Sequence, residues 1–545
     1  MNVRVFLNRA AKSGSVAALF IALALAALSA YGASLTTPAL PKTFDTTYAA
    51  PSGNTINVAA DGDLQDALNR ARLGDTIVLQ AGATYTGPFK LPHKSDGSGW
   101  VYVRTSAYSR LPAPGMRVGL VDAVSMPKIV GTSRGGGAIV TAANAHHFRF
   151  VGIEFAPTPG QFLYQVISLS NGDRDASTLP SYITFDRCYV HSDPAKGGRR
   201  GIQMDGTFIA VVDSYISDFK EIGADSQGLW AYNSPGPFKI VNNYLEAAGE
   251  NVMFGGADAQ IQDMVPSDIE IRDNYFFKPL SWIGSPWTVK NLLEFKNAQR
   301  VLVAHNRFEN NWPAAQQGFA LLMTPRNQDG GAPWSIVQDI TFSSNLIINV
   351  GSAFNISASD DLHPSRATSR VLIRDNVVIV TGLQAASGRV FQTLGGPTDV
   401  TIDHNTAFCS AASGNAVFGM AENKLKAERY TFTNNVVSKG NWGFIGTGTG
   451  DGLATLNAMF ANWTFSRNAI IGGSSSAYPT GNFFPANEGA VKFVDIAAGN
   501  FRLTDKSPYR NAATDGRDLG ADVDAVRAAG NVELAIPSPQ LGGRN

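Results

Sequence analysis

One pattern recurs in VLVAHNRF (301–308), ITFSSNLII (340–348), VLIRDNVVI (371–379) and VTIDHNTAF (400–408). Each stretch has an apolar strand that alternates with polar residues, then an Asn, then a second short apolar strand. The pattern returns about every 31 residues between residues 183 and 471, so the chain is built from repeats. The aligned positions are Cys188, Ser214, Asn243, Asn274, Asn306, Asn345, Asn376, Asn405, Asn435 and Asn468.

These repeats predict an all-β fold. Alternating apolar residues indicate half-buried strands, and a unit this short buries its apolar face only by stacking on its neighbours. A third, looser strand follows each aligned position, for example GLWAY (228–232) and LLEFK (292–296). Helical periodicity is almost absent, which excludes an α-solenoid, and a β-propeller would need four strands in each unit. We therefore expect a single-stranded parallel β-helix with three strands per coil.

The recurring Asn has two predicted roles. An Asn between two strands tolerates the left-handed backbone of a tight bend. Stacked Asn side chains can also hydrogen-bond to one another along the stack. We expect both at the aligned positions, so that the Asn itself is the left-handed residue and its amide belongs to a ladder.

Both ends of the β-helix are expected to be capped. DLQDALNRAR (63–72) places four apolar residues on one helical face, which predicts an N-terminal capping helix at about 61–72. The segment 491–545 is predicted to close the other end, and the whole β-helix domain is predicted to span 55–545.

The first residues have the pattern of an export signal. Basic residues precede an apolar run at 16–28, and small residues follow it. We predict a signal peptide at 1–32 and a linker at 33–54, with a periplasmic or extracellular mature protein that has no membrane span. An uncleaved membrane anchor is the alternative.

Charge and cysteine content exclude two other properties. Lys plus Arg and Asp plus Glu both number 44, so the formal net charge is zero and nucleic acid is not an expected partner. Cys188 and Cys409 lie seven coils apart, roughly 34 Å at the spacing of stacked strands, which is too far for a disulfide. Both are predicted to be free thiols in a monomer.

The capping helix, GDTIVLQAGATYTG (74–87), the Asn-bearing coils and GNFRLTDKSPYRNA (499–512) together resemble a known group. They are similar to secreted bacterial right-handed parallel β-helix proteins of the pectate-lyase-like superfamily. That resemblance implies a right-handed coil and a polysaccharide as partner, because many members are polysaccharide lyases or glycoside hydrolases. The Asn-Thr-Asp, Gly-His-Gly and Arg-Ile-Lys motifs of polygalacturonase-type hydrolases and the Arg-x-Pro-x-x-Arg motif of pectate lyases are absent from this sequence.

A local similarity to the alginate-lyase and chondroitinase-B-like lyases covers NLLEFKNAQRVLVAHNRFENN (291–311). It implies that Lys296 is a catalytic base and that Arg326 assists it in β-elimination on a uronate polysaccharide. Asn327 follows Arg326 where that family has His, and we expect it to contact the substrate.

Two carboxylates are expected beside this lysine. Strand alternation puts Glu294 and Lys296 on the outer face, and Glu250 in the preceding coil could approach Glu294. Ca²⁺ takes carboxylate oxygens, so Glu250 and Glu294 are candidate ligands, and Glu250 also a candidate substrate contact. Alternatively, Glu294 and Lys296 form a solvated ion pair, or Glu250 and Glu294 form the carboxyl pair of a glycoside hydrolase.

Three further residues are candidates for sugar binding. Trp230 and Tyr232 offer aromatic faces of the kind that stack on sugar rings, and Asp205 could bind a sugar hydroxyl. A non-catalytic envelope protein that binds glycan, or serves as a scaffold, would carry the same residues. The sequence thus predicts a protein that binds or acts on polysaccharide, with lyase chemistry as the leading activity.

Overall fold

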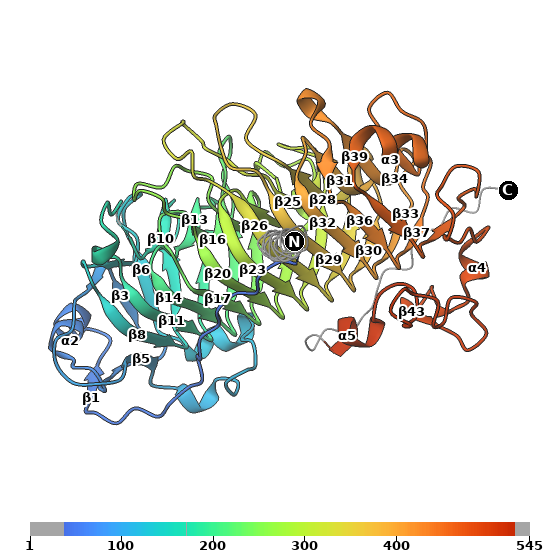
Figure 1. Ribbon diagram of the computed structural model, residues 1–545. Helices are drawn as coiled ribbons and strands as arrows, with labels where there is room; N and C mark the ends of the chain where they lie inside the picture. The colour runs from blue at the N-terminus through green and yellow to red at the C-terminus, as the bar shows by residue number, and fades with distance from the viewer. Residues whose placement is uncertain (1–36, 171, 529–545) are drawn as a thin grey trace, which may run out of the picture. The chain divides into compact units, whose positions relative to one another are not determined.

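The computed structural model describes residues 37–170 and 172–528, and the predicted signal peptide at 1–32 lies outside these residues. The described residues from Pro38 onward form one compact unit. Its strands stack in three parallel sheets, and each coil contributes one strand to each sheet in turn (Figure 1). The unit is a right-handed parallel β-helix, as the repeats and the resemblance predicted.

The first sheet contains β1 (Thr55–Val58), β2 (Thr76–Leu79), β5 (Val101–Thr105), β8 (His146–Val151), β11 (Ser181–Asp186), β14 (Thr207–Val212), β17 (Phe238–Val241), β20 (Ser267–Arg272), β23 (Ala298–Ala304), β26 (Val337–Ser343), β29 (Ser369–Arg374), β32 (Thr398–Asp403), β35 (Ala427–Glu428), β36 (Thr431–Thr433), β39 (Phe460–Ala461) and β40 (Thr464–Ser466).

The second sheet contains β3 (Thr84–Thr86), β6 (Lys128–Gly131), β9 (Glu154–Pro157), β12 (Tyr189–His191), β15 (Tyr215–Phe219), β18 (Tyr244–Ala247), β21 (Tyr275–Phe277), β24 (Arg307–Asn311), β27 (Leu346–Val350), β30 (Val377–Val380), β33 (Thr406–Cys409), β37 (Val436–Ser438) and β41 (Ala469–Ile471).

The third sheet carries the candidate site and contains β4 (Phe89–Leu91), β7 (Ile139–Thr141), β10 (Gln165–Ser168), β13 (Arg200–Gln203), β16 (Gln227–Ala231), β19 (Glu250–Phe254), β22 (Leu293–Phe295), β25 (Phe319–Met323), β28 (Ser352–Ser357), β31 (Arg389–Leu394), β34 (Asn415–Met420) and β38 (Phe444–Gly446). A hairpin of β42 (Phe493–Asp495) and β43 (Asn500–Leu503) follows.

Helices are short. The α-helices are α2 (Leu64–Arg70), α3 (Leu453–Met459), α4 (Glu488–Val491) and α5 (Val523–Ala528). The 3₁₀ helices are η1 (Tyr108–Arg110), η2 (Leu120–Ser125), η3 (Ala176–Thr178), η4 (Leu280–Trp282), η5 (Leu383–Ala385) and η6 (Glu422–Lys424). Within the described ranges, no helix is long and apolar enough to cross a membrane.

Like residues stack on like residues inside the coil. In the first sheet, Ile240, Ile271, Val303 and Phe342 lie in register on successive strands and are fully buried. Parallel strands about 4.8 Å apart bring such side chains into direct contact, so each coil completes the core of its neighbour.

The Asn ladder is present, and Asn482 extends it by one rung. In a typical rung, the backbone N–H of Asn306 and its Nδ2 both donate to Oδ1 of Asn345, at 2.9 and 3.0 Å. Our expectation for the bend itself was wrong by one residue. The left-handed residue is the one before the ladder position, for example His305 at φ 59° and Ser344 at φ 56°. The buried side chain of the ladder Asn instead hydrogen-bonds to the backbone of the turn and to the next ladder residue.

A ladder substitution should reduce stability. Asn345→Ser keeps an oxygen that can accept the Asn306 N–H, as Ser214 accepts the N–H of Cys188 at 2.9 Å. It loses the amide that donates to Val303 O and to the next rung. We expect a loss of about 1–2 kcal/mol in the free energy of unfolding, measured by chemical denaturation. An unchanged denaturation midpoint would mean that this rung of the ladder contributes nothing to the free energy of unfolding.

The two ends are covered differently. Helix α2 is capped by Asp63 and buries Leu64, Ala67 and Leu68 against the first coils, as the periodicity predicted. The C-terminal residues up to 528 pack on the outer face of the second sheet, where Val523 joins an apolar cluster formed by β27, β30 and β33.

Residues 38–49 form an extended segment, here called the strap, which follows the outer face of the first sheet back to β1. The N–H of Ala39 donates to Asp339 at 3.0 Å, and the N–H of Lys42 donates to Asp268 at 2.9 Å. Later carbonyls of the strap accept from side chains on β8 and β5. The blue trace that passes β17 on its way to β1 shows this path (Figure 1). Much of the predicted linker is therefore packed against the β-helix.

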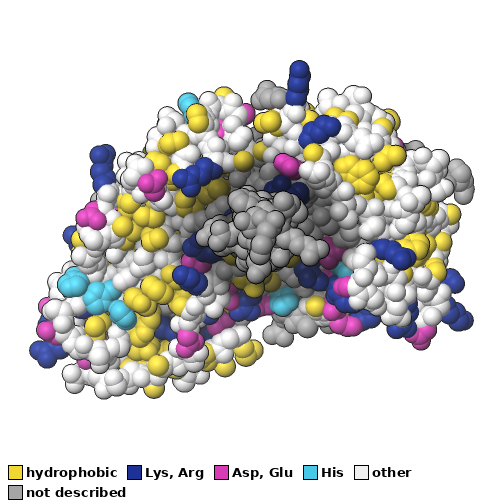
Figure 2. Space-filling view, viewed as in Figure 1, with side chains coloured by type: hydrophobic (Ala, Val, Ile, Leu, Met, Phe, Trp, Pro, Cys, Tyr) yellow, Lys and Arg dark blue, Asp and Glu magenta, His cyan; other side chains and the backbone are white. Residues whose placement is uncertain are grey.

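Surface charge is mixed. Lys and Arg side chains alternate with Asp and Glu side chains over one face (Figure 2), as the neutral charge balance indicates. Both cysteines are free, and Cys188 is fully buried. Burial raises the pKa of the Cys188 thiol to about 12, so it is an unreactive core side chain.

Candidate functional site

The outer face of β22 positions the predicted base. Leu293 and Phe295 are fully buried in the core, which leaves Glu294 between them on the opposite face, with Lys296 directly after the strand. This alternation agrees with the sequence prediction. Lys296 Nζ lies 3.6 Å from Glu294 Oε1, and the lysine side chain is 13% exposed. The lysine side chain is therefore partly exposed, while its carboxylate partner is almost fully buried.

Neighbouring residues hold Glu294 in place. Asn291 Nδ2 donates to Oε2 at 3.0 Å, and Thr324 Oγ1 donates to Oε1 at 3.2 Å. The side chain of Glu294 is only 2% exposed. A carboxylate with two donors and an ammonium nearby is well compensated for its burial.

Glu250 begins β19, one strand away, and is fully buried. Gln227 Nε2 donates to its Oε2 at 2.8 Å, and Lys290 Nζ lies 3.8 Å from its Oε1. Lys290 is bound more closely by Asp225, at 2.6 Å. Acidic and basic side chains thus alternate around one spot on the third sheet.

The pKa of Glu250 is raised to about 7. Burial is the main cause, and the negative charges of Asp225 and Glu294 add to it, while Lys290 and Lys296 act in the opposite direction. The influence of Glu294 and Lys296 supports the predicted approach of Glu250 to this pair. A carboxyl group that titrates near neutral pH is typical of functional sites.

The oxygen atoms at this site are of the types that bind hard cations such as Ca²⁺. Among the described residues, Glu250 Oε1 and Asn291 Oδ1 are buried without a hydrogen-bond partner. With Glu294 they provide two carboxylates and an amide oxygen, which Ca²⁺ accepts as ligands. Within the same described ranges, no three His, Cys, Asp or Glu residues are grouped as a metal site. Solvent or substrate oxygens would have to complete the coordination.

Arg326 lies in the next coil, and its backbone N–H donates to Lys296 O at 2.9 Å. Its guanidinium already binds Asp360 at 2.8 Å and Asp361 at 3.0 Å. Asn327 is fully buried, donates to a backbone carbonyl and accepts from Ala332 N. The structure thus brings Arg326 near the base but pairs its charge, and it uses the Asn327 side chain within the loop.

The three predicted sugar contacts lie several coils upstream. Trp230 and Tyr232 stack with ring centroids 4.5 Å apart, and Trp230 Nε1 donates to Gly255 O. Asp205 is fully buried and accepts from the backbone N–H groups of Tyr232 and Asn233 at 2.9 and 2.8 Å. Asp205 therefore orders the turn after β16.

Sequence reasoning missed four residues at this site, namely Gln227, Lys278, Asn291 and the closely paired Lys290. Lys278 is fully buried and its Nζ donates to three backbone carbonyls just before Glu250. Gln227 begins β16, and Lys290 and Asn291 shortly precede β22, whereas Lys278 directly follows β21 of the second sheet. Apolar alternation gives no signal at these positions. Polar residues preceding each third strand were the available clue.

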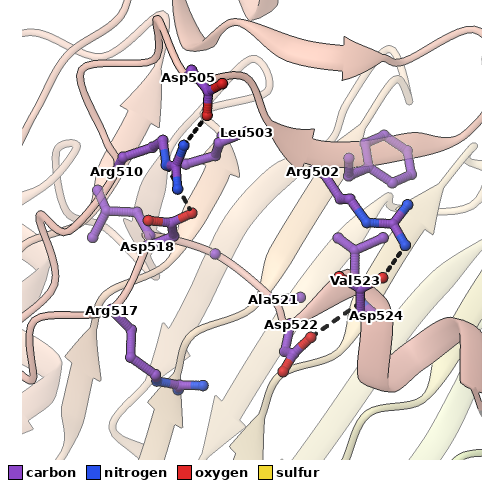
Figure 3. Close-up of a pocket in the computed structure, with 13 residues that line it drawn as sticks. Arg502, Leu503, Asp505, Arg510, Arg517, Asp518, Ala521, Asp522, Val523 and Asp524 are labelled. Atoms are coloured by element: carbon purple, nitrogen blue, oxygen red, sulfur yellow. Dashed lines mark hydrogen bonds and ion pairs between the residues drawn. The ribbon is translucent and has the colours of Figure 1, made fainter.

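A different cavity, of about 390 Å³, lies at the C-terminal segment (Figure 3). Its charges are paired with one another: Arg510 binds Asp505 and Asp518, and Arg502 binds Asp524. Asp522 accepts from two N–H groups at the start of α5. These charged side chains therefore bind one another within the C-terminal segment.

No family model matches the chain, and no curated protein matches it. Among solved structures it is similar to the PL6 family alginate lyase AlyGC, with 14% identity, a TM-score of 0.49, and coverage of 89% of this chain and 57% of that one. It is also similar to a mannuronic acid specific family 6 polysaccharide lyase from human gut microbiota, with 12% identity, a TM-score of 0.45, and coverage of 79% of this chain and 91% of that one. For pectate lyase Pel9A the identity is 13%, the TM-score is 0.32, and the match covers 86% of this chain and 96% of that one. At such identities the likeness concerns the fold alone, and the three stacked parallel sheets define the class of fold as a right-handed parallel β-helix.

Glu250 should make stability depend on pH. Its pKa is about 7 in the folded protein against an ordinary 4.5, so between these values the folded state binds more protons than the unfolded chain. The stabilisation is complete below pH 4.5 and is lost as the pH rises through about 7. Glu250→Gln keeps an oxygen for Gln227 and removes the titration. Between pH 5 and pH 8, we expect the free energy of unfolding of the variant to rise by roughly 2–3 kcal/mol relative to that of the parent.

Chemical denaturation across this pH range measures the difference. Asp329→Asn, at an exposed position, is the control and should parallel the parent. A constant difference between Glu250→Gln and the parent at every pH would contradict the raised pKa.

Proposed function

We propose that the protein binds an acidic polysaccharide along the outer face of the third sheet and cleaves it by β-elimination, with Lys296 as the base. One observation carries the proposal: the partly exposed side chain of Lys296 lies beside the buried carboxylate of Glu294, and Glu250, also buried, begins the neighbouring strand. The predicted signal peptide fits a polymer encountered outside the cytoplasm.

The reaction needs a base at the carbon next to the uronate carboxylate. Lys296, acting as the neutral amine, takes the proton from this carbon, and the electron pair forms a C=C bond as the neighbouring glycosidic C–O bond breaks. The departing oxygen takes a proton from water, and Lys296 later returns its proton to solvent. Atoms and charge therefore balance without a redox partner.

Neutralising the uronate carboxylate makes the proton easier to remove. Arg326, near Lys296 in the next coil, supplies positive charge for this if the substrate displaces Asp361, the more exposed of its two partners. Glu250, Glu294 and Asn291 would hold Ca²⁺, which supplies the same neutralisation when bound.

A panel of uronate polymers tests the proposal. Cleavage by elimination creates an unsaturated sugar, so ultraviolet absorbance from the new C=C bond should rise together with reducing ends. Carboxyl-reduced polymers should give neither signal. Absence of absorbance across alginate, pectate and glucuronate-containing polymers would refute lyase activity.

Glycoside hydrolysis is the second candidate, and the pKa of Glu250 favours it. A carboxyl group with a pKa of about 7 suits a general acid, with Glu294 as its ionised partner. Both side chains are almost fully buried, so a hydrolase would require movement of the surrounding loops. New reducing ends without ultraviolet absorbance would support this reaction instead.

A further inference from the structure

A cavity of about 610 Å³ lies on the outer face of β7, β10, β13 and β16, away from Lys296. Two of its lining side chains are cationic, Lys90 and Arg200, and none of the described lining residues is Asp or Glu. The other polar side chains include Gln165, Ser168 and Gln203. Unlike the paired C-terminal cavity, this one carries net positive charge.

Arg200 differs from its neighbour Arg199. Glu221 binds Arg199 through two hydrogen bonds, at 2.6 and 2.8 Å. Arg200 donates only through Nε, to Gln227 at 2.9 Å, and among the described residues no carboxylate forms an ion pair with it. Among the residues that the structure describes, the two terminal nitrogens of its guanidinium therefore have no acidic hydrogen-bond or ion-pair partner.

An aromatic ring fixes the orientation of this guanidinium. The guanidinium carbon of Arg200 lies 3.9 Å from the ring centroid of Trp230, and Tyr232 stacks on the same indole. One hydrogen bond and one cation–π contact thus hold the arginine in place before any ligand arrives. Its pKa is lowered to about 10, chiefly by burial and then by Arg199, while the charges of Glu250 and Asp225 act in the opposite direction without forming an ion pair with it.

Polar groups around Arg200 match the rest of a sugar ring. Gln203 Oε1 accepts from Gln165 and Ser168 at 3.4 Å each, so these contacts are long and can be exchanged for ligand hydroxyls. Tyr232 and Trp230 add an apolar wall. Convergent polar groups on an apolar wall are typical of small-ligand sites.

We infer that the Arg200 cavity is a binding subsite for the carboxylate of an acidic sugar residue, and that Trp230 orients Arg200 rather than stacking on the sugar. A planar guanidinium with two free nitrogens matches a carboxylate through paired hydrogen bonds. The inference rests on the proposed function only for the class of sugar, a uronate. It does not depend on cleavage of that sugar.

The subsite belongs to a long groove. Three strand steps separate β13 from β22, which is roughly 14 Å at the spacing of parallel strands. An oligosaccharide bound at Lys296 and at Arg200 must therefore span several sugar units. The subsite should strengthen binding of long chains and leave the chemistry at Lys296 unchanged.

Direct binding tests this separately from turnover. The full chain with Lys296→Ala is titrated calorimetrically with hexamers of galacturonate and of mannuronate, with carboxyl-reduced hexamers, and with a sulfated hexamer. Arg200→Gln in this background should weaken binding of one uronate hexamer at least about tenfold, and Arg200→Lys should weaken it less.

Arg389 offers a matched control. It also begins a third-sheet strand, bonds to a Gln, Gln392, and lies over an aromatic ring, Phe418, at 3.6 Å, but it does not line the cavity. Arg389→Gln should bind the hexamer within about twofold of its parent, because its nitrogens lie outside the subsite.

The outcomes separate the two proposals. Equal binding by Arg200→Gln and its parent, or equal losses for uronate and carboxyl-reduced hexamers, would overturn the subsite. Preference for the sulfated hexamer would overturn the carboxylate assignment. Arg200-dependent uronate binding in a protein that cleaves nothing would sustain the subsite and remove the lyase proposal.

Discussion

Lys296→Ala should abolish polysaccharide cleavage, with a loss of about 10²–10⁴-fold in kcat. No other amine lies beside Glu294 within ion-pair distance in the described part of the chain, so nothing replaces the proton acceptor. The assay is the rise in ultraviolet absorbance on the polymer that the parent protein cleaves. Binding of the same polymer should be weakened far less than kcat, which identifies a catalytic rather than an anchoring role.

Lys426→Ala is the control for this variant. Lys426 is exposed and its Nζ donates only to a backbone carbonyl, so its loss should leave cleavage unchanged. If Lys296→Ala cleaves at the parent rate, the base is another group and the lyase assignment to this spot is wrong.

Lys278→Met should cause the largest loss of stability. The buried ammonium donates to the carbonyls of Ala247, Ala248 and Gly249 at 2.6–2.9 Å and to Asn251 Oδ1 at 3.1 Å. Methionine fills the space but offers no donor, so these buried oxygens are left unsatisfied. We expect a loss of roughly 3–5 kcal/mol in the free energy of unfolding, measured by chemical denaturation at pH 7.

The same variant should disturb the site, because the three carbonyls immediately precede Glu250. The pH dependence of unfolding should also change, because burial lowers the pKa of Lys278 itself to about 7 and the charge of Glu250 acts on it in the opposite direction. Lys426→Met, at the surface, should change neither quantity. A Lys278→Met protein as stable as the parent would show that the turn is held by its strands alone.

Much of the fold could be predicted because its signals are local. Alternation within a few residues gives each strand, and the regular return of Asn gives the ladder. The left-handed residue was predicted one position too late, at Asn345, whereas the structure has it at Ser344. A bend constrains several residues, and the ladder contacts also select for Asn, so the Asn pattern alone does not identify the left-handed residue.

The candidate site could be predicted only in part. Glu294 and Lys296 share one strand, so alternation alone places them on one face. The acids that bind Arg326 come from Asp360 and Asp361, in a loop of the next coil, and no local pattern links them. Likewise, nothing near Arg200 in the sequence indicates that it lacks an acidic partner, since this depends on which loops fold over the sheet.

The strap changes how a stack of coils can come apart. A solenoid whose coils contact only their neighbours can fray from either end, one coil at a time. The strap joins Ala39 to Asp339 on β26 and also contacts β8 and β5, so the intervening coils are fastened at points remote in the stack. Opening the first coils alone would leave strap contacts on the later ones, so we expect the coils that the strap crosses to open together rather than one at a time.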